Sequence, residues 1–88
     1  MNATFPLTVS TPDGDVFKKN AVMLSLRGSE GDLAILAGHV PFVTTVRAGA
    51  CKIVLPDGSI VTGQINGGLL TVARDFVSLL VGSFKEEK

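Results

Sequence analysis

The sequence has no tryptophan, no tyrosine, a single cysteine and no net charge. Because Cys51 is the only cysteine, an internal disulfide is excluded, and the composition is typical of a reducing compartment. Eight basic residues balance eight acidic ones, so the basic excess of a nucleic-acid-binding protein is missing. The five phenylalanines do not alternate with basic residues, and a stacking platform for single-stranded nucleic acid is therefore unsupported.

Long apolar runs are also absent. No stretch approaches the roughly eighteen apolar residues of a transmembrane helix, and residues 1–6 lack the regions of a signal peptide, which predicts a cytosolic protein. The chain of 88 residues is short enough for one core only. A hydrophobic share of 45% and a mean hydropathy of +0.42 predict a folded chain, and are high enough to indicate that some apolar surface meets a partner.

Turn residues divide the chain at short intervals into segments rich in Val, Ile, Leu, Thr and Phe. Such spacing is typical of an all-β sandwich or barrel. No stretch shows a sustained helical period flanked by caps. The turn markers are residues 12–14, 19–20, 28–31, 38, 48–49, 56–58, 66–68 and 74–75.

Apolar residues alternate with polar ones in several segments, which predicts strands with one face toward a core. The expected inward sets are Phe5, Leu7 and Val9; Val22, Leu24 and Leu26; and Cys51, Ile53 and Leu55. Residues 76–81 break the rule because they are apolar on both faces. Such a strand is either central or covered by something outside the domain.

Two turn sequences predict hairpins. Asp57-Gly58 suits a turn that needs a positive φ, and would join residues 52–55 to residues 60–65. Asn66-Gly67-Gly68 would lead into residues 69–73 by the same reasoning.

Catalytic and metal-binding patterns are weak. A zinc site needs three or four ligands, and the chain has one cysteine and one histidine without a C-x-x-C pair. His39 is the only imidazole base and Asp32 could orient it, but no nucleophile elbow supports a hydrolytic triad. Glycines 28, 31 and 38 lack the Gly-Lys-Ser/Thr of a phosphate loop, so turns explain them better.

One segment, residues 28–49, is poorly explained by generic β packing. In residues 28–41 (GSEGDLAILAGHVP), Glu30 and Asp32 lie in a glycine-bounded loop, followed by an apolar strand and a Gly-His-x-Pro turn. By residue type alone, the two carboxylates are ordinary solvated loop charges and His39 is a surface turn residue.

This segment resembles the signature of the epsilon subunit of F-type ATP synthases, roughly G-x-E-G-[DE]-[LM]-G-I-[LY]-P-G-H-A-P. Residues 66–72 (NGGLLTV) are similar to the family's S-G-G-x-[LV]-E-V, and the resemblance spans about residues 4–81. Ala34, Ala37 and Asn66 depart from the usual Gly, Pro and Ser. Family members continue into a pair of C-terminal helices, so a naturally short member and a fragment of a longer protein both stay open.

The resemblance implies a flattened β-sandwich of about ten short strands over residues 1–84, with a polar tail at residues 85–88. It implies a non-catalytic rotor subunit in the central stalk of a proton-translocating synthase. Such a subunit links the gamma subunit to the c-ring and helps couple ion flow to ATP synthesis. Glu30 and Asp32 match the positions that face the c-ring, and Thr11, His39 and Thr44 match those that face gamma.

The same resemblance implies no cofactor, no metal and, without the helical pair, no ATP binding. The expected location is peripheral, at the cytoplasmic face of a bacterial membrane, or on the stromal side of a chloroplast thylakoid. Two alternatives stay open: a free-standing β-sandwich adaptor or ligand-binding module, and a small hydrolase that uses His39.

Overall fold

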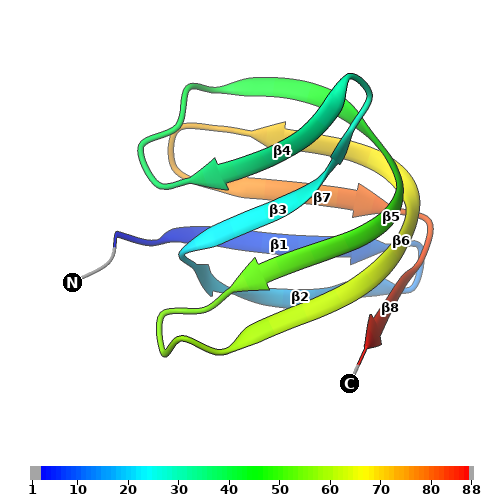
Figure 1. Ribbon diagram of the computed structural model, residues 1–88, viewed down its shortest axis with the longest axis horizontal. Coiled ribbons are helices and arrows are strands. Elements are labelled where there is room, and N and C mark those ends of the chain that lie inside the picture. The colour runs from blue at the N-terminus through cyan, green and yellow to red at the C-terminus, as the bar shows by residue number, and fades with distance from the viewer. Residues whose placement is uncertain (1–2, 88) are drawn as a thin grey trace.

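The computed structural model describes residues 3–87, and these form eight β-strands and no helix (Figure 1). No helix long and apolar enough to span a membrane is therefore found between residues 3 and 87. The strands are β1 (Phe5–Thr11), β2 (Gly14–Ala21), β3 (Met23–Gly28), β4 (Gly31–Leu36), β5 (Phe42–Val54), β6 (Ile60–Val72), β7 (Val77–Val81) and β8 (Phe84–Glu87).

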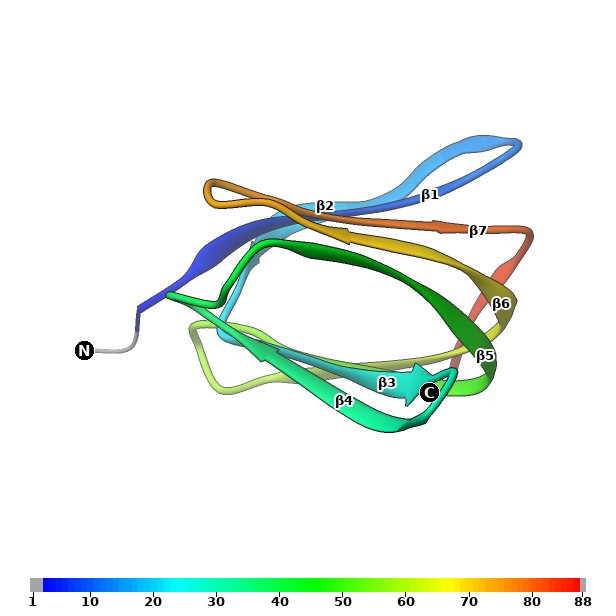
Figure 2. The ribbon, with the colours of Figure 1, turned by 90° about the horizontal axis from the view of Figure 1, so that it is seen from above.

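The strands form one sheet that folds back on itself into two layers (Figure 2). Their order is β2-β1-β7-β6-β5-β3-β4, and β8 pairs with the first half of β6. Only β1 and β7 run parallel; the other neighbours are antiparallel. The first layer holds β1, β2 and β7, and the second holds β3, β4 and β8, while β5 and β6 run through both. The all-β sandwich predicted from the sequence is thus confirmed.

Strands β5 and β6 are 13 residues long each, which corrects the expectation of about ten short strands. The predicted hairpin at Asn66-Gly67-Gly68 is wrong, because β6 continues through it and stays paired with β5 on both sides. Gly67 has a φ of 101°, which lets the strand bend between the layers rather than reverse. A Cβ at Gly68 would overlap the backbone oxygen of Leu80 on β7.

The hairpin between β5 and β6 is confirmed. Gly58 adopts a φ of 89°, and its N–H donates to the oxygen of Leu55 at 3.0 Å. The Asp57 carboxylate accepts from the backbone N–H of Ser59 at 2.9 Å and from its hydroxyl at 2.6 Å. These hydrogen bonds hold the pKa of Asp57 below its usual value.

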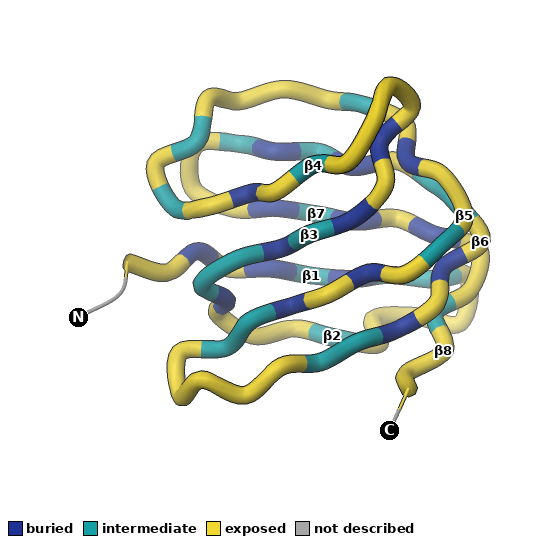
Figure 3. The backbone as a smooth tube through the Cα atoms, in the orientation of Figure 1, coloured by how far each residue is buried: buried dark blue, intermediate teal, exposed yellow. Residues whose placement is uncertain are grey.

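The core lies between the layers and contains no buried polar or charged residue among residues 3–87. Buried positions alternate with exposed or intermediate ones along most strands, as Figure 3 shows. The inward assignments for β1 are confirmed, as are those of Leu24 and Leu26, and of Cys51 and Ile53, while Val22 and Leu55 are only half-buried. The core residues are Phe5, Leu7, Val9, Ala21, Leu24, Leu26, Ile35, Val46, Cys51, Ile53, Ile65, Leu70, Val72, Val77, Leu79 and Val81.

The doubly apolar segment forms β7, which is central because it lies between β1 and β6. Its outer residue Leu80 nevertheless remains 54% exposed. Residues 85–87, assigned to a polar tail from the sequence, belong to β8, whose Phe84 ring packs over Gly63 on β6. Lys88 lies outside the described residues.

Candidate functional site

The groups that could support catalysis are not brought together. His39 lies after the end of β4, half-buried, with its ring edge-on to Phe5 at a centroid distance of 5.7 Å. Its Nδ1 atom is buried and has no hydrogen-bond partner among the described residues, so Asp32, at the far end of β4, does not orient it. No group of three potential metal ligands occurs within residues 3–87.

The Cys51 thiol is equally unsuited to chemistry. It is fully buried in β5, and burial raises its pKa to about 11 because the charged thiolate would lose its hydration. A thiol of this kind is inert at neutral pH.

The acidic residues assigned to the c-ring lie at the turn between β3 and β4, and both are exposed. Gly28 pairs with Gly31 across the turn, and Gly31 adopts a φ of 136°. Asp32 is opposite Arg27 in the strand register, whereas Glu30 lies in the turn itself. The turn therefore presents carboxylates to solvent, with a net negative charge.

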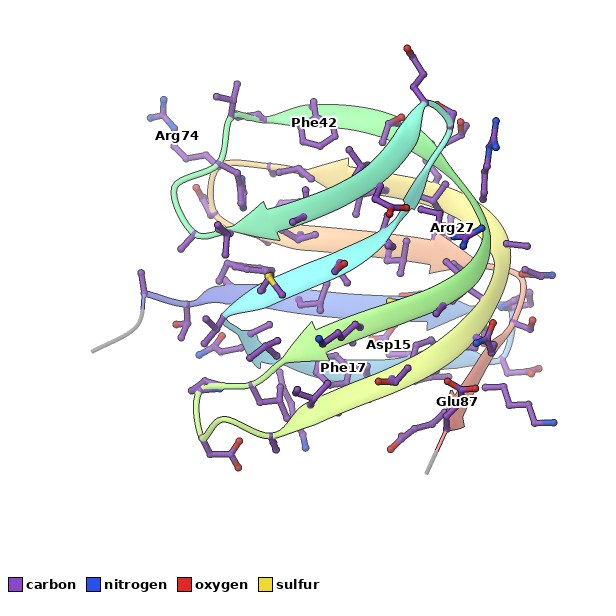
Figure 4. The ribbon with its side chains drawn as sticks, viewed as in Figure 1. Asp15, Phe17, Arg27, Phe42, Arg74 and Glu87 are labelled. Carbon is purple, nitrogen blue, oxygen red and sulfur yellow. The ribbon has the colours of Figure 1, made fainter. Side chains whose placement is uncertain are left out.

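A pocket of about 330 Å³ opens beside this turn. One wall is residues 28–33 and the other is the start of β5, residues 42–44. The ring of Phe42 lies between β5 and β4 in the view of Figure 4. Apolar side chains and carboxylates thus line one concave surface.

The three residues assigned to gamma lie in different places. Thr11 ends β1, where its hydroxyl accepts from the N–H of Asp13 at 3.1 Å. His39 packs on Phe5 at the other end of β1, about 20 Å away along a strand of this length. Thr44 lines the pocket with Glu30 and Asp32. The structure therefore groups Thr44 with the acidic turn rather than with Thr11 or His39.

A further surface was missed from the sequence: the outer side of β1, β7, β6 and β5. Two rows of paired residues cross these four strands, and none of the eight is charged. We call them the neutral face; they are Ser10, Leu80, Leu69 and Thr45 in one row, and Thr8, Ser78, Thr71 and Val43 in the other. The available signal was the two-sided apolar character of residues 76–81.

Exposure and charge set the neutral face apart. Val43, Leu80 and Leu69 are 62%, 54% and 40% exposed, which is unusual for three aliphatic side chains on one small surface. The charged residues nearest to the two rows lie at their margins: Asp15 and Lys18 on the edge strand β2 pair with the first residues of the rows, and Arg47 follows Thr45 by two positions on β5. A partner could therefore cover this face without desolvating an ion.

Together, the folded sheet and these surfaces define a β-sandwich domain suited to protein contacts. Residues 4–87 match the family model of the ATP synthase delta/epsilon chain β-sandwich domain. The chain belongs to this family.

Relatives in two Bacillus species carry the name ATP synthase epsilon chain. The chain is 38% identical to that of Bacillus velezensis over 77 residues, which is 88% of this chain and 58% of the relative. It is 34% identical to that of Bacillus thuringiensis over 83 residues, 94% of this chain and 62% of the relative. The chain thus spans about three-fifths of the length of these relatives.

Solved structures share the fold. A chain of the Euglena gracilis mitochondrial ATP synthase, in an OSCP/F1/c-ring structure, superposes with a TM-score of 0.90 at 22% identity over 98% of this chain and 55% of that one. A chain of the Tetrahymena thermophila mitochondrial ATP synthase, in a central stalk and c-ring structure, gives a TM-score of 0.73 at 17% identity, covering 94% and 66%.

Proposed function

We propose that this chain is a non-catalytic rotor subunit of a proton-translocating F-type ATP synthase. It links the gamma subunit to the c-ring and helps couple ion flow to ATP synthesis. Family membership and the names of the relatives support the assignment to the synthase. The neutral face is the observation that carries the mechanical role, because an uncharged, partly apolar sheet face is what a lasting protein contact requires.

The gamma subunit covers the neutral face in this proposal. Exposed Leu69 and Leu80 supply apolar area at its centre and Val43 at its β5 end, and threonine and serine hydroxyls supply hydrogen bonds around them. Two further residues extend the contact: Thr11 is the last residue of β1, and His39 packs on Phe5, the first residue of β1.

The c-ring contacts Glu30 and Asp32. Carboxylates at an exposed turn accept charge-assisted hydrogen bonds from basic or polar side chains of a neighbouring loop. Such contacts orient the partners more than they raise affinity. Thr44, beside the acidic turn, lies at the boundary between this contact and the one with gamma.

A pair of charged variants tests the gamma contact. Leu69→Lys with Leu80→Lys places two cations on the neutral face, and we expect at least a tenfold loss of gamma binding in co-purification from membranes. Leu36→Lys with Ile60→Lys is the matched control, since these residues are each 53% exposed and lie in the second layer of the sheet. Equal gamma binding by both variants would contradict the assigned face.

The proposal includes no cofactor, no metal, no nucleic acid and no ATP binding for this chain. Its place is peripheral, at the cytoplasmic face of a bacterial membrane or the stromal side of a thylakoid, held there by the synthase. A chain that binds neither gamma nor the c-ring would instead be a free-standing adaptor.

A further inference from the structure

Part of strand β5 has a free edge. β6 follows β5 along its whole length, but β3 leaves β5 at Val46, whose pairing with Gly28 is the last one toward the start of β5. Among residues 3–87, no strand pairs with residues 42–45 on the side away from β6. The pocket lies on this side, between β5 and the turn of β3 and β4.

Two hydrogen bonds show which backbone groups reach the free edge. The N–H of Val22 donates to the oxygen of Val54 at 2.7 Å, so Val54 directs its carbonyl toward β3. The N–H of Leu55 donates to the oxygen of Ser59 at 2.9 Å, so the next residue bonds on the β6 side. The register between β5 and β6 has no shift, and orientation alternates along a strand. Phe42 and Thr44 therefore turn their N–H and C=O groups toward the pocket.

This edge lacks the protection seen elsewhere in the fold. The free edge of β2 carries Lys18 and Lys19 and is distorted by a bulge opposite Val9 and Ser10, which are the usual defences against strand pairing. Residues 42–45 (FVTT) carry no charge, no proline and no bulge. An edge left open beside a pocket is suited to strand addition.

The lining of the pocket indicates what kind of strand fits. Leu33 and Phe42 offer apolar contacts, and Glu30 and Asp32 lie at the turn. Arg27 is opposite Asp32, so the turn keeps a net negative charge through Glu30. An extended segment with small apolar side chains and a lysine or arginine near Glu30 matches this surface in shape and charge.

We propose that an extended segment of a partner protein adds as a strand to the edge of β5, bonding the backbone of Phe42 and Thr44 and placing a basic side chain beside Glu30. The inference rests on the proposed function in treating Glu30 as a contact residue. It goes further in naming backbone pairing as the means of attachment.

Amide hydrogen exchange tests strand addition directly. The probe is a synthetic peptide of alternating valine and threonine with a lysine at one end, mixed with the 88-residue chain. We expect the Thr44 amide to exchange freely alone and at least tenfold more slowly with the peptide. The amides of Val43 and Thr45, which bond β6, are protected in both states. An unchanged Thr44 amide at saturating peptide overturns the proposal.

Proline variants provide the second test. Thr44→Pro removes an N–H that faces the pocket, so the fold should persist while peptide affinity falls at least tenfold. Thr44→Val keeps the N–H and should bind the peptide normally. If Thr44→Pro unfolds the chain, the wild-type chain is tested instead with an N-methylated peptide. The methyl groups block the peptide's backbone hydrogen bonds, so this peptide should not bind. Normal binding by Thr44→Pro, or by the N-methylated peptide, overturns the proposal.

Two outcomes separate this inference from its alternatives. A dimer of the chain alone, with Thr44 protected before any peptide is added, would assign the edge to a second copy and overturn the proposal. Normal gamma and c-ring assembly without peptide binding would overturn strand addition and leave the proposed function standing. Peptide binding by a chain that binds neither gamma nor the c-ring would overturn the proposed function and leave strand addition standing.

Discussion

The side-chain oxygen of Asn66 accepts a hydrogen bond from the backbone N–H of Ser83 at 3.0 Å. This contact joins the bend of β6 to the connection between β7 and β8, and it lies beside Gly82, where a Cβ would approach the Asn66 amide to 2.7 Å. One polar side chain therefore fixes the path of the chain into its last strand.

Replacing Asn66 with alanine should loosen β8. Because the contact is exposed, we expect a loss of about 1 kcal/mol in unfolding free energy. Thermal unfolding measures the loss, and hydrogen exchange of β8 amides locates it. Gln64→Ala is the control, since Gln64 reaches Glu87 only at 3.4 Å. A larger effect in the control would show that Asn66 does not anchor β8.

Two glycines of β6 should differ sharply when changed to alanine. A methyl group at Gly68 meets the backbone of Leu80, which cannot move without breaking the pairing of β6 and β7. A methyl group at Gly63 meets only the far end of the Phe84 ring, at 2.5 Å, and the ring can turn aside. We expect Gly68→Ala to cost about 3 kcal/mol and Gly63→Ala about 1 kcal/mol in chemical denaturation. A larger loss of unfolding free energy in Gly63→Ala than in Gly68→Ala would be inconsistent with the close approach of Gly68 to the backbone of Leu80.

Stability should decline in alkali through Cys51. Its pKa is about 11 in the folded chain against 9.0 as the ordinary value, so the unfolded chain releases the proton first as pH rises. The contribution of the neutral Cys51 thiol to the unfolding free energy is complete below pH 9 and is lost progressively up to about pH 11. Denaturation of wild type and Cys51→Ala across this range isolates the effect, because other groups titrate in both. If the unfolding free energies of the two proteins change in parallel with pH, Cys51 makes no such contribution.

Reversing the charge of the acidic turn should uncouple the synthase. We expect Glu30→Lys with Asp32→Lys to fold normally, because both side chains are exposed, but to weaken proton-driven ATP synthesis in reconstituted membranes. Glu86→Lys with Glu87→Lys, on β8, is the matched control. Full ATP synthesis by the first variant would remove the assigned c-ring contact.

His39→Phe should be tolerated. The new ring keeps the edge-on contact with Phe5, and the buried Nδ1 without a partner is removed, so unfolding free energy should stay equal or rise by up to about 1 kcal/mol. His39→Ala, which loses the ring contact, should be less stable. Rotor assembly should weaken at most mildly in both variants, whereas a hydrolase that uses His39 would lose its activity.

The faces of the strands could be predicted from the sequence because alternation is local. The inward assignment of Phe5, Leu7 and Val9 needed only the spacing of apolar residues. The number of strands could not be predicted in this way. Asn66-Gly67-Gly68 has the chemistry of a hairpin, but pairing with β5 and β7 keeps the strand continuous, and pairing is a tertiary property.

Surface features could likewise be predicted from the sequence where they are local, and not where they depend on tertiary pairing. The exposure of Glu30 and Asp32 followed from their glycine-bounded loop. The proximity of Thr44 to them did not, because it depends on how the turn of β3 and β4 meets the start of β5. The neutral face draws on four strands, so no window of sequence contains it.

The two layers of this fold are not independent sheets, because β5 and β6 pass through both as unbroken backbone. Sliding one layer over the other would have to bend both long strands further and break hydrogen bonds between strands. A twisting load applied to one layer is therefore carried to the other by continuous, paired backbone.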